Sequence, residues 1–360
     1  MFLPPALPPR LALAHLPTPL EPMPRLSAAL GLDLRVKRDD LTGSHLSGNK
    51  IRKLDFLLAD ARAQGATHVL TCGGIQSNHA RATALAAAPL GMTPVLLLRT
   101  PNGSADDLAG SLAPGSELDP TRGLRKQLPA APTANLLLDR LAGARIVPCT
   151  PADYRERRGA LLETLAAELR TAGGTPVVIP EGGSNALGAL GYATAAWELL
   201  AQYDALGLAP PDTCVVATGS GGTLAGLALG FEAAGVPTRA IGVAVCDDRP
   251  TFEAIVHRIA AEATDRYGLP RLSPARFEVL DGFQGRGYAL TTDDELAFLV
   301  TTLRQDGLAL DPVYTNKAFR ALVATAAAPA RPLGTHIAFI HTGGIFGLFA
   351  EATALTNAAR

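Results

Sequence analysis

The chain has 360 residues, 48% of them hydrophobic, which is enough to bury a large core and typical of two globular domains of about 150 residues each. Its charges nearly cancel, with 32 Lys and Arg against 33 Asp and Glu, and no long basic or acidic block occurs. This balance disfavours nucleic acid and membrane surfaces as partners and favours a small molecule.

The first residues and the cysteines bear on location. Residues 1–20 are apolar but contain six prolines, so they are not expected to be a signal peptide, and no run approaches the roughly 20 apolar residues of a membrane span. Cys72, Cys149, Cys214 and Cys246 lie far apart without CxxC spacing, which indicates free thiols in a reducing compartment. A cytoplasmic location is predicted.

Cys72 lies directly before two glycines, and a role as a catalytic nucleophile stays open as an alternative for this thiol.

A Pro-rich arm over residues 1–30 and a short strand over 33–40 are predicted to lead into a small polar loop before Lys50. Apolar residues then recur at helical spacing up to Ala61. A helix is therefore expected to begin at this lysine and to stop at Gly65.

Lys50 and Lys53 would share one face of that helix. A second ammonium one turn away, together with burial, disfavours the charged form of Lys50, which would make it a usable amine near neutral pH. Two solvated surface lysines remain the alternative at this point.

Beyond Gly65, strands and helices alternate. The predicted strands are 67–71, 94–98, 145–149, 176–179, 213–218, 240–245, 277–280 and 336–340. The predicted helices are 79–90, 135–141, 152–171, 187–201, 224–234, 252–267, 293–306, 316–327 and 346–356. Such alternation predicts an α/β protein with a parallel sheet covered by helices. Residues 100–132 break this pattern, being rich in Pro, Gly, Ser and Asp, and are expected to be a long surface loop and a candidate lid.

A glycine-rich loop follows the predicted strand 213–218. Its residues are Gly219, Ser220, Gly221, Gly222 and Thr223. Between a strand and a helix, such a loop gathers backbone N–H groups at a positive helix end, which suits a phosphate. It is neither a Walker A loop nor a complete GxGxxG motif, so nucleotide binding is disfavoured, whereas a packing turn stays open as the alternative.

A second glycine loop leads from Gly73 to Asn78. Ser77 or Asn78 can cap the following helix while free N–H groups accept the carboxylate of a small amino acid. Simple capping without a ligand is the alternative.

Other candidate side chains lie in loops or at strand ends. Tyr288 and Tyr314 occupy loops, where a phenol can exchange a proton or orient a substrate, although packing tyrosines are common. His341 ends a strand at the sheet edge where sites gather, and a structural role is the favoured interpretation for it. No clustered His, Cys or carboxylate spacing indicates a metal.

A lysine able to form a Schiff base, a phosphate cup and a second helix-start anion site together describe an enzyme that uses pyridoxal 5'-phosphate (PLP) on an amino acid. Six stretches, SGNKIRKL, GGIQSNHAR, EGGSNALGALGY, ATGSGGTLAGL, LDPVYT and FIHTGG, follow in order across nearly the whole chain. In them the chain resembles the 1-aminocyclopropane-1-carboxylate deaminase/D-cysteine desulfhydrase family.

The resemblance implies the tryptophan synthase β-like fold (fold type II), with two open, twisted, mostly parallel sheets flanked by helices. It also implies a homodimer. It also implies a large domain formed by residues 1–51 and 166–360 and a small domain over 52–165 that closes over the site. Lys50 resembles the Schiff-base lysine and α-proton base. Asn78 would bind the cofactor's 3-hydroxyl, and the loop Gly219–Thr223 with Lys53 would hold the phosphate. The residues implied at the substrate are Gln76, Ser77, Asn78, His79, Tyr288 and Tyr314.

Two features favour a desulfhydrase within this family. Deaminases that open the cyclopropane ring tend to carry Glu after the DPVY tyrosine, near the pyridine nitrogen, whereas this chain has Thr315 there, as desulfhydrases do. The helix start QSNHAR is also closer to desulfhydrases. The resemblance therefore implies β-elimination from D-cysteine. Ring-opening deamination and L-cysteate sulfo-lyase activity are the family alternatives, and a non-catalytic amino-acid or PLP-binding protein is the alternative of another class.

Overall fold

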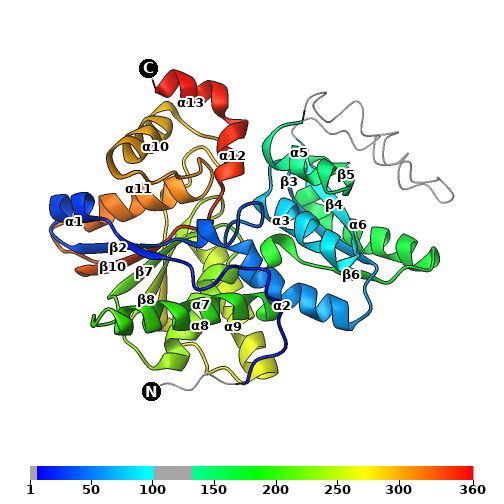
Figure 1. The fold of residues 1–360 in the computed structure, drawn as a ribbon, viewed down its shortest axis with the longest axis horizontal. Helices are drawn as coiled ribbons and strands as arrows, with labels where there is room; N and C mark the ends of the chain where they lie inside the picture. Colours follow the sequence, from blue (N-terminus) through cyan, green and yellow to red (C-terminus); the bar gives the residue numbers. More distant parts are fainter. Residues whose placement is uncertain (1–5, 101–131, 360) are drawn as a thin grey trace. The chain divides into compact units, whose positions relative to one another are not determined.

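The computed structural model describes residues 6–100 and 132–359. The chain separates into two compact units, whose elements are labelled in Figure 1. Unit 1 comprises Met1–Phe56 and Ser184–Arg360, and unit 2 comprises Leu57–Gly183. The predicted loop over 100–132 lies outside the described residues except for its two end positions.

Unit 2 ends later in the chain than the small domain predicted over 52–165. β6 (Pro176–Val178) pairs with β3 (His68–Gly74), so the chain remains in the unit 2 sheet beyond residue 165. A boundary at 165 would cut α6 (Pro151–Thr171). At the other boundary, α2 (Lys50–Ala63) begins in unit 1 and continues in unit 2.

Unit 1 contains a six-stranded sheet in the order β1-β2-β10-β7-β8-β9. Its strands are β1 (Leu20–Pro22), β2 (Asp33–Lys37), β7 (Thr213–Thr218), β8 (Arg239–Ala244), β9 (Phe277–Leu280) and β10 (His336–Ile340). β1 is antiparallel to β2, and all other neighbours are parallel. The mostly parallel open sheet predicted from the sequence is thus confirmed.

Helices cover both faces of this sheet, as Figure 1 shows. The helices of unit 1 besides α2 are α1 (Pro24–Leu30), α7 (Ala186–Ala205), α8 (Gly222–Ala234), α9 (Arg249–Tyr267), α10 (Asp293–Asp306), α11 (Thr315–Ala326), α12 (Ile345–Ala350) and α13 (Ala352–Ala358), with short 3-10 turns η1 (Asp39–Leu41) and η5 (Pro274–Arg276). In β7, Cys214 and Val216 pack against α7, α8 and α9, whereas Val215 and Ala217 pack against α10 and α11. Successive side chains of a strand point to opposite faces, so the middle of this strand, residues 214–217, is apolar on both faces.

The N-terminal segment is more ordered than the Pro-rich arm predicted over 1–30. β1 adds an antiparallel edge strand to β2, and Pro22 is tolerated there because an edge strand need not donate every N–H. α1 begins with Pro24 and ends at Gly31, whose φ of +64° closes the helix. The proline content hid both elements from sequence reasoning.

Unit 2 holds a four-stranded parallel sheet in the order β5-β4-β3-β6. Its elements besides β3, β6 and the end of α2 are β4 (Thr93–Arg99), β5 (Arg145–Cys149), α3 (Asn78–Ala87), α5 (Ala134–Leu141), α6, and the short turns η2 (Ala88–Leu90) and η4 (Glu181–Gly183). α6 packs on one face of the sheet, and α3 and α5 pack on the other. The second predicted parallel sheet is confirmed.

The thiols and helices of the described residues bear on two further predictions. All four cysteines are free, and only Cys246 is not buried, which confirms the free-thiol prediction. Burial raises the pKa of Cys72 to about 12, so this thiol lacks the thiolate character that a nucleophile needs. Among the described helices, none combines the length and the hydropathy needed to cross a membrane.

Gly226 lets α7 and α8 approach closely. A Cβ atom at Gly226 would lie 2.3 Å from the Ala189 carbonyl oxygen and 2.5 Å from Tyr192 Cβ. We expect Gly226→Ala to lower the free energy of unfolding by about 1–3 kcal/mol, because the helices must move apart. Gly159→Ala in α6, where nothing lies within 4 Å, is the control and should stabilise by about 0.5–1 kcal/mol. Urea unfolding measures both, and equal effects would contradict the packing argument.

Candidate active site

Lys50 is the first residue of α2, as predicted, and is held in a tightly built loop. Gly48 has a φ of +101°, and a Cβ there would lie 2.8 Å from the Thr342 carbonyl oxygen, so only glycine fits. The Asn49 N–H donates to that same oxygen at 3.1 Å. Lys50 Nζ donates to Asn49 Oδ1 at 3.0 Å. The loop therefore fixes the lysine at the helix start.

Lys53 lies one turn further along α2 and is buried. Its ammonium donates to Ser184 Oγ at 3.2 Å. Burial, and next the charge of Lys50, hold the pKa of Lys53 well below its ordinary value. An anion placed at this point would favour the ammonium form of Lys53.

The glycine loop joins β7 to α8 next to these lysines. Gly221, the N-cap of α8, has a φ of +78°, and a Cβ there would lie 2.5 Å from Ile255 Cγ2. A Cβ at Gly222 would lie 2.6 Å from Ser184 Oγ, to which the Gly222 N–H donates at 3.2 Å. Asn49 Nδ2 donates to Thr223 Oγ1 at 3.1 Å and so ties the lysine loop to the glycine loop.

The donors around this loop fit the phosphate of PLP. The start of the 13-residue helix α8 supplies N–H groups and a positive dipole end. Ser184 and Ser220 share a hydrogen bond at 2.8 Å, and Thr223 adds a further hydroxyl. A phosphate bound here would favour the ammonium form of the buried Lys53, which then supplies the opposite charge. The predicted residues Lys50, Lys53 and 219–223 are thus brought together within unit 1.

Tyr288 and Tyr314 are also brought together in unit 1. Tyr314 Oη donates to Tyr288 Oη at 2.9 Å, with the rings edge to face. A Cβ at Gly219 would lie 3.1 Å from Tyr314 Cε1, so this tyrosine lies against the glycine loop. Burial, followed by the neighbouring Tyr288, raises the pKa of Tyr314 well above its ordinary value, and Tyr314 keeps its proton.

Lys317 holds the loop that carries Tyr288. The sequence did not predict this role of Lys317. Its buried ammonium donates to the carbonyl oxygens of Gln284 at 2.6 Å and Gly287 at 2.8 Å. These partners are about 30 residues away in the chain, so no local pattern reveals them.

Thr315 is fully buried at the start of α11. Its hydroxyl donates to Asp311 Oδ1 at 2.7 Å, and the Asp311 N–H donates to the Thr315 oxygen at 2.7 Å. The Asp311 carboxylate also accepts the N–H groups of Val313, Tyr314 and Thr315. Asp311 therefore fixes the Thr315 hydroxyl. An Asp shortly before a helix start is a capping signal that could have identified it.

His341 has a structural environment, in line with the favoured interpretation. The Gly343 N–H donates to Nδ1 at 3.2 Å, so Nε2 carries the proton and donates to the Ala309 carbonyl oxygen at 3.0 Å. The buried ring thus joins the FIHTGG loop to the segment before α11.

Within unit 2, Ser77 and Gln76 make helix-end contacts. Ser77 is the N-cap of α3, and its Oγ accepts the Ala80 N–H at 3.2 Å. Gln76 Oε1 accepts the Asn135 N–H at 3.0 Å, and its Nε2 donates to the Thr133 carbonyl oxygen at 3.2 Å. The capping role named as the alternative is therefore present for Ser77, and the amide of Gln76 caps α5.

His79 is buried on α3 in the same unit. Thr71 Oγ1 donates to the Ile179 carbonyl oxygen at 2.8 Å, so it accepts from His79 Nε2 at 2.9 Å. This contact fixes the ring between α3 and β3. The half-buried Asn78 begins α3.

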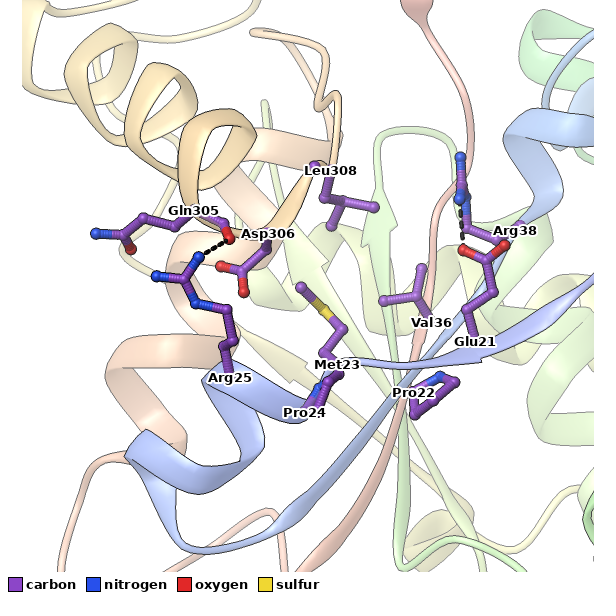
Figure 2. Close-up of a pocket in the computed structure, with 11 residues that line it drawn as sticks. Glu21, Pro22, Met23, Pro24, Arg25, Val36, Arg38, Gln305, Asp306 and Leu308 are labelled. Atoms are coloured by element: carbon purple, nitrogen blue, oxygen red, sulfur yellow. Dashed lines mark hydrogen bonds and ion pairs between the residues drawn. The ribbon is translucent and has the colours of Figure 1, made fainter.

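A hollow of about 250 Å³ lies in unit 1 between the N-terminal segment and the end of α10. Figure 2 shows its cations already engaged. Arg25 donates to the Gln305 carbonyl oxygen at 2.7 Å, and Arg38 pairs with Glu21 at 2.5 Å. The hollow contains none of the predicted site residues.

Comparison with known proteins identifies the class. A family model described as pyridoxal-phosphate dependent enzyme matches residues 11–343. The chain therefore belongs to the PLP-dependent enzymes, with PLP as its cofactor and the fold type II architecture predicted from the motifs.

Comparison with individual relatives shows which family of PLP-dependent enzymes the chain belongs to. The chain is 41% identical to a Thermotoga maritima protein provisionally named 1-aminocyclopropane-1-carboxylate deaminase, over 96% of this chain and 99% of the relative. It is 39% identical to the mitochondrial bifunctional D-cysteine desulfhydrase/1-aminocyclopropane-1-carboxylate deaminase of Arabidopsis thaliana, over 94% of this chain and 79% of the relative. A crystal structure described as an ACC deaminase homologue matches with a TM-score of 0.82 and 34% identity, covering 97% of this chain and 96% of that one. The chain belongs to the 1-aminocyclopropane-1-carboxylate deaminase/D-cysteine desulfhydrase family.

Removal of the Lys53 ammonium tests the phosphate assignment. We expect Lys53→Met to weaken PLP binding by roughly tenfold or more, because a charge-assisted contact is lost. Binding of pyridoxal, which lacks the phosphate, should not weaken in the same variant. Fluorescence titration of the apoprotein with both compounds measures the difference, and an equal loss for both would contradict the assignment.

Proposed function

We propose that this protein catalyses β-elimination from a small amino acid, with D-cysteine as the substrate, to give pyruvate, hydrogen sulfide and ammonia. The observation that carries the proposal is the joined arrangement of Lys50, the buried Lys53 and the glycine loop through the Asn49 to Thr223 hydrogen bond. It pairs a lysine amine with a phosphate site inside one unit.

Lys50 is proposed to attach the cofactor covalently and, once the substrate has replaced it there, to take the α-proton at Nζ. Bound PLP supplies an electron sink for the charge left at the α-carbon. The glycine loop Gly219–Thr223 and Lys53 hold the phosphate. The motif match assigns Asn78 to the cofactor's 3-oxygen and Thr315 to the region of the ring nitrogen. It assigns Gln76, Ser77, Asn78, His79, Tyr288 and Tyr314 to the substrate.

The choice of D-cysteine is supported by Thr315. A hydroxyl at this position, in place of the Glu of ring-opening deaminases, leaves the ring a weaker electron sink, which suffices to expel a thiolate. The Arabidopsis relative is named for both activities, and the Thermotoga relative for deamination. Ring-opening deamination of 1-aminocyclopropane-1-carboxylate is therefore the second candidate, and L-cysteate sulfo-lyase activity is the third.

One assay separates these candidates. Release of pyruvate or 2-oxobutyrate is measured with PLP in excess across D-cysteine, L-cysteine, β-chloroalanine, L-cysteate and 1-aminocyclopropane-1-carboxylate. We expect pyruvate and sulfide from D-cysteine at the highest kcat/KM. Predominant 2-oxobutyrate from the cyclopropane substrate would favour the second candidate. No turnover of any compound would favour a non-catalytic binding protein.

We also propose that the protein forms a homodimer and that it is located in the cytoplasm. The family resemblance supports the dimer, and the free cysteines support a reducing compartment. Sedimentation of the PLP-loaded protein measures the assembly.

A further inference from the structure

The side chain of Asn135, at the start of α5 in unit 2, connects three groups. It is fully buried. Its Oδ1 accepts from Arg81 Nε at 3.2 Å. Its Nδ2 donates to the Gln76 carbonyl oxygen at 2.9 Å and to Asn78 Oδ1 at 3.0 Å.

The chemistry of these partners fixes which way both amides face. A guanidinium can only donate, so the Asn135 atom facing Arg81 must be the oxygen. A backbone carbonyl can only accept, so the atom facing Gln76 must be the nitrogen. The Asn135 amide therefore cannot be turned over without breaking contacts on both sides. Since its NH2 group also faces Asn78, the Asn78 atom on that side must be the oxygen.

The half-buried Asn78 then has one orientation available. Its Oδ1 is engaged by Asn135, and its Nδ2 points away from that contact with no hydrogen bond to any described residue. Toward a ligand, Asn78 can offer only N–H donors.

We propose that Asn135 is a positioning residue that holds the Asn78 amide so that Nδ2 donates to the 3-oxygen of the cofactor. This rests on the proposed function, in which Asn78 contacts that oxygen. An anionic oxygen needs a donor, whereas an unrestrained amide can present either end.

Two neighbouring helices anchor the arrangement. Asn78 and Arg81 are three residues apart on α3, and Asn135 and Asp139 are four residues apart on α5, so each pair lies on one helix face. Arg81 and Asp139 are both fully buried. Burial lowers the pKa of Arg81 to about 10 and raises that of Asp139 to about 8, while the charge of each group opposes the shift in the other. The guanidinium that orients Asn135 is thus held inside the core of unit 2.

Asn135→Asp is the test, because it changes one donor atom with almost no change in shape. The introduced carboxylate still accepts from Arg81, but its second oxygen repels Asn78 Oδ1 and turns that amide over. An acceptor would then face the 3-oxygen and favour the form that holds a proton there. We expect the pH midpoint of the visible absorption band of the lysine-bound cofactor to rise by about one unit. The PLP dissociation constant should rise roughly tenfold.

Two variants make the test specific. Asn78→Asp, which replaces the outward donor directly and leaves Asn135 intact, should reproduce the rise in the midpoint. In an Asn78→Ala background, Asn135→Asp should no longer move the midpoint, because its effect acts through Asn78. Asn357→Asp on the exposed face of α13 is the matched control and should change neither quantity.

An unchanged midpoint in Asn135→Asp, or a shift that persists without the Asn78 amide, would overturn the inference while leaving the proposed function intact. A wild-type protein that develops no visible band with PLP would overturn both. Thermal unfolding of each variant separates a local effect from loss of the fold.

Discussion

Replacing Lys50 by alanine is expected to lower kcat by at least about a thousandfold, because the proposed covalent attachment and the proposed proton transfer both use Nζ of this residue. The visible absorption band of lysine-bound PLP should disappear as well. The protein should still fold, since Lys50 is only half-buried and its hydrogen bond to Asn49 joins adjacent residues. Stopped assays with D-cysteine and absorption spectra measure both effects.

Lys50→Arg is the matched control for charge. Arginine keeps a cation at the helix start but stays protonated, so it cannot replace the amine. We expect it to be as inactive as the alanine variant. Full turnover in Lys50→Ala without the band would exclude the proposed mechanism. Activity in Lys50→Arg would indicate a purely electrostatic role.

Replacing Asp39 by alanine is expected to lower the free energy of unfolding by about 3–5 kcal/mol, because the buried Arg52 loses one of its two carboxylate partners and two buried hydroxyls lose their acceptor. Asp39 is 0% exposed and Arg52 is 2% exposed. Arg52 donates to both Asp39 oxygens, at 2.8 and 2.9 Å. Tyr192 Oη and Thr18 Oγ1 donate to the same carboxylate at 2.6 and 2.8 Å.

The same group gives the expected pH dependence. Burial alone would raise the pKa of Asp39, but the charges of Arg52 and Lys37 hold it below its ordinary value. The carboxylate therefore contributes stability above the unfolded-state pKa of about 4, and this is lost as the pH falls through the lower folded-state value. Wild-type unfolding free energies should fall below pH 4 more steeply than those of Asp39→Ala.

Glu163→Ala is the control for an exposed ion pair. Glu163 bonds Arg170 at 2.6 Å, but the two side chains are 63% and 52% exposed. Its removal should change the unfolding free energy by no more than about 0.5 kcal/mol. Urea unfolding measures both substitutions. Similar effects would contradict a stabilising role for the buried contacts of Asp39.

The sequence predicted the elements whose signals are local. Lys50 at a helix start and the 219–223 loop after an apolar strand both belong to patterns of strand, glycine loop and helix, whose parts follow one another closely in the sequence. Repetition of that pattern predicted a parallel sheet covered by helices, and the resemblance to fold type II enzymes implied a second sheet. The prolines of residues 1–30 carried a true local signal, but pairing of β1 with β2 overrode it.

Long-range polar contacts escaped prediction for a physical reason. Arg52 reaches Glu198, which is 146 positions away, and Arg81 reaches Asn135, which is 54 positions away. Nothing in the neighbouring sequence marks these side chains as buried, since charged and amide groups are usually exposed. Lys317 is a third example, with its partners in a loop that sequence reasoning treated only as the site of Tyr288.

The hydrogen bond from Asn49 to Thr223 has a consequence for how such an enzyme can diversify. It joins the segment bearing Lys50 to the glycine loop inside one compact unit, so that the spacing between them is set when unit 1 folds. The Tyr288 loop is held by Lys317 from α11 and meets the glycine loop through Tyr314. Substitutions in the Tyr288 loop that keep the Tyr288 and Tyr314 contact can therefore accumulate while the bond from Asn49 to Thr223 stays in place.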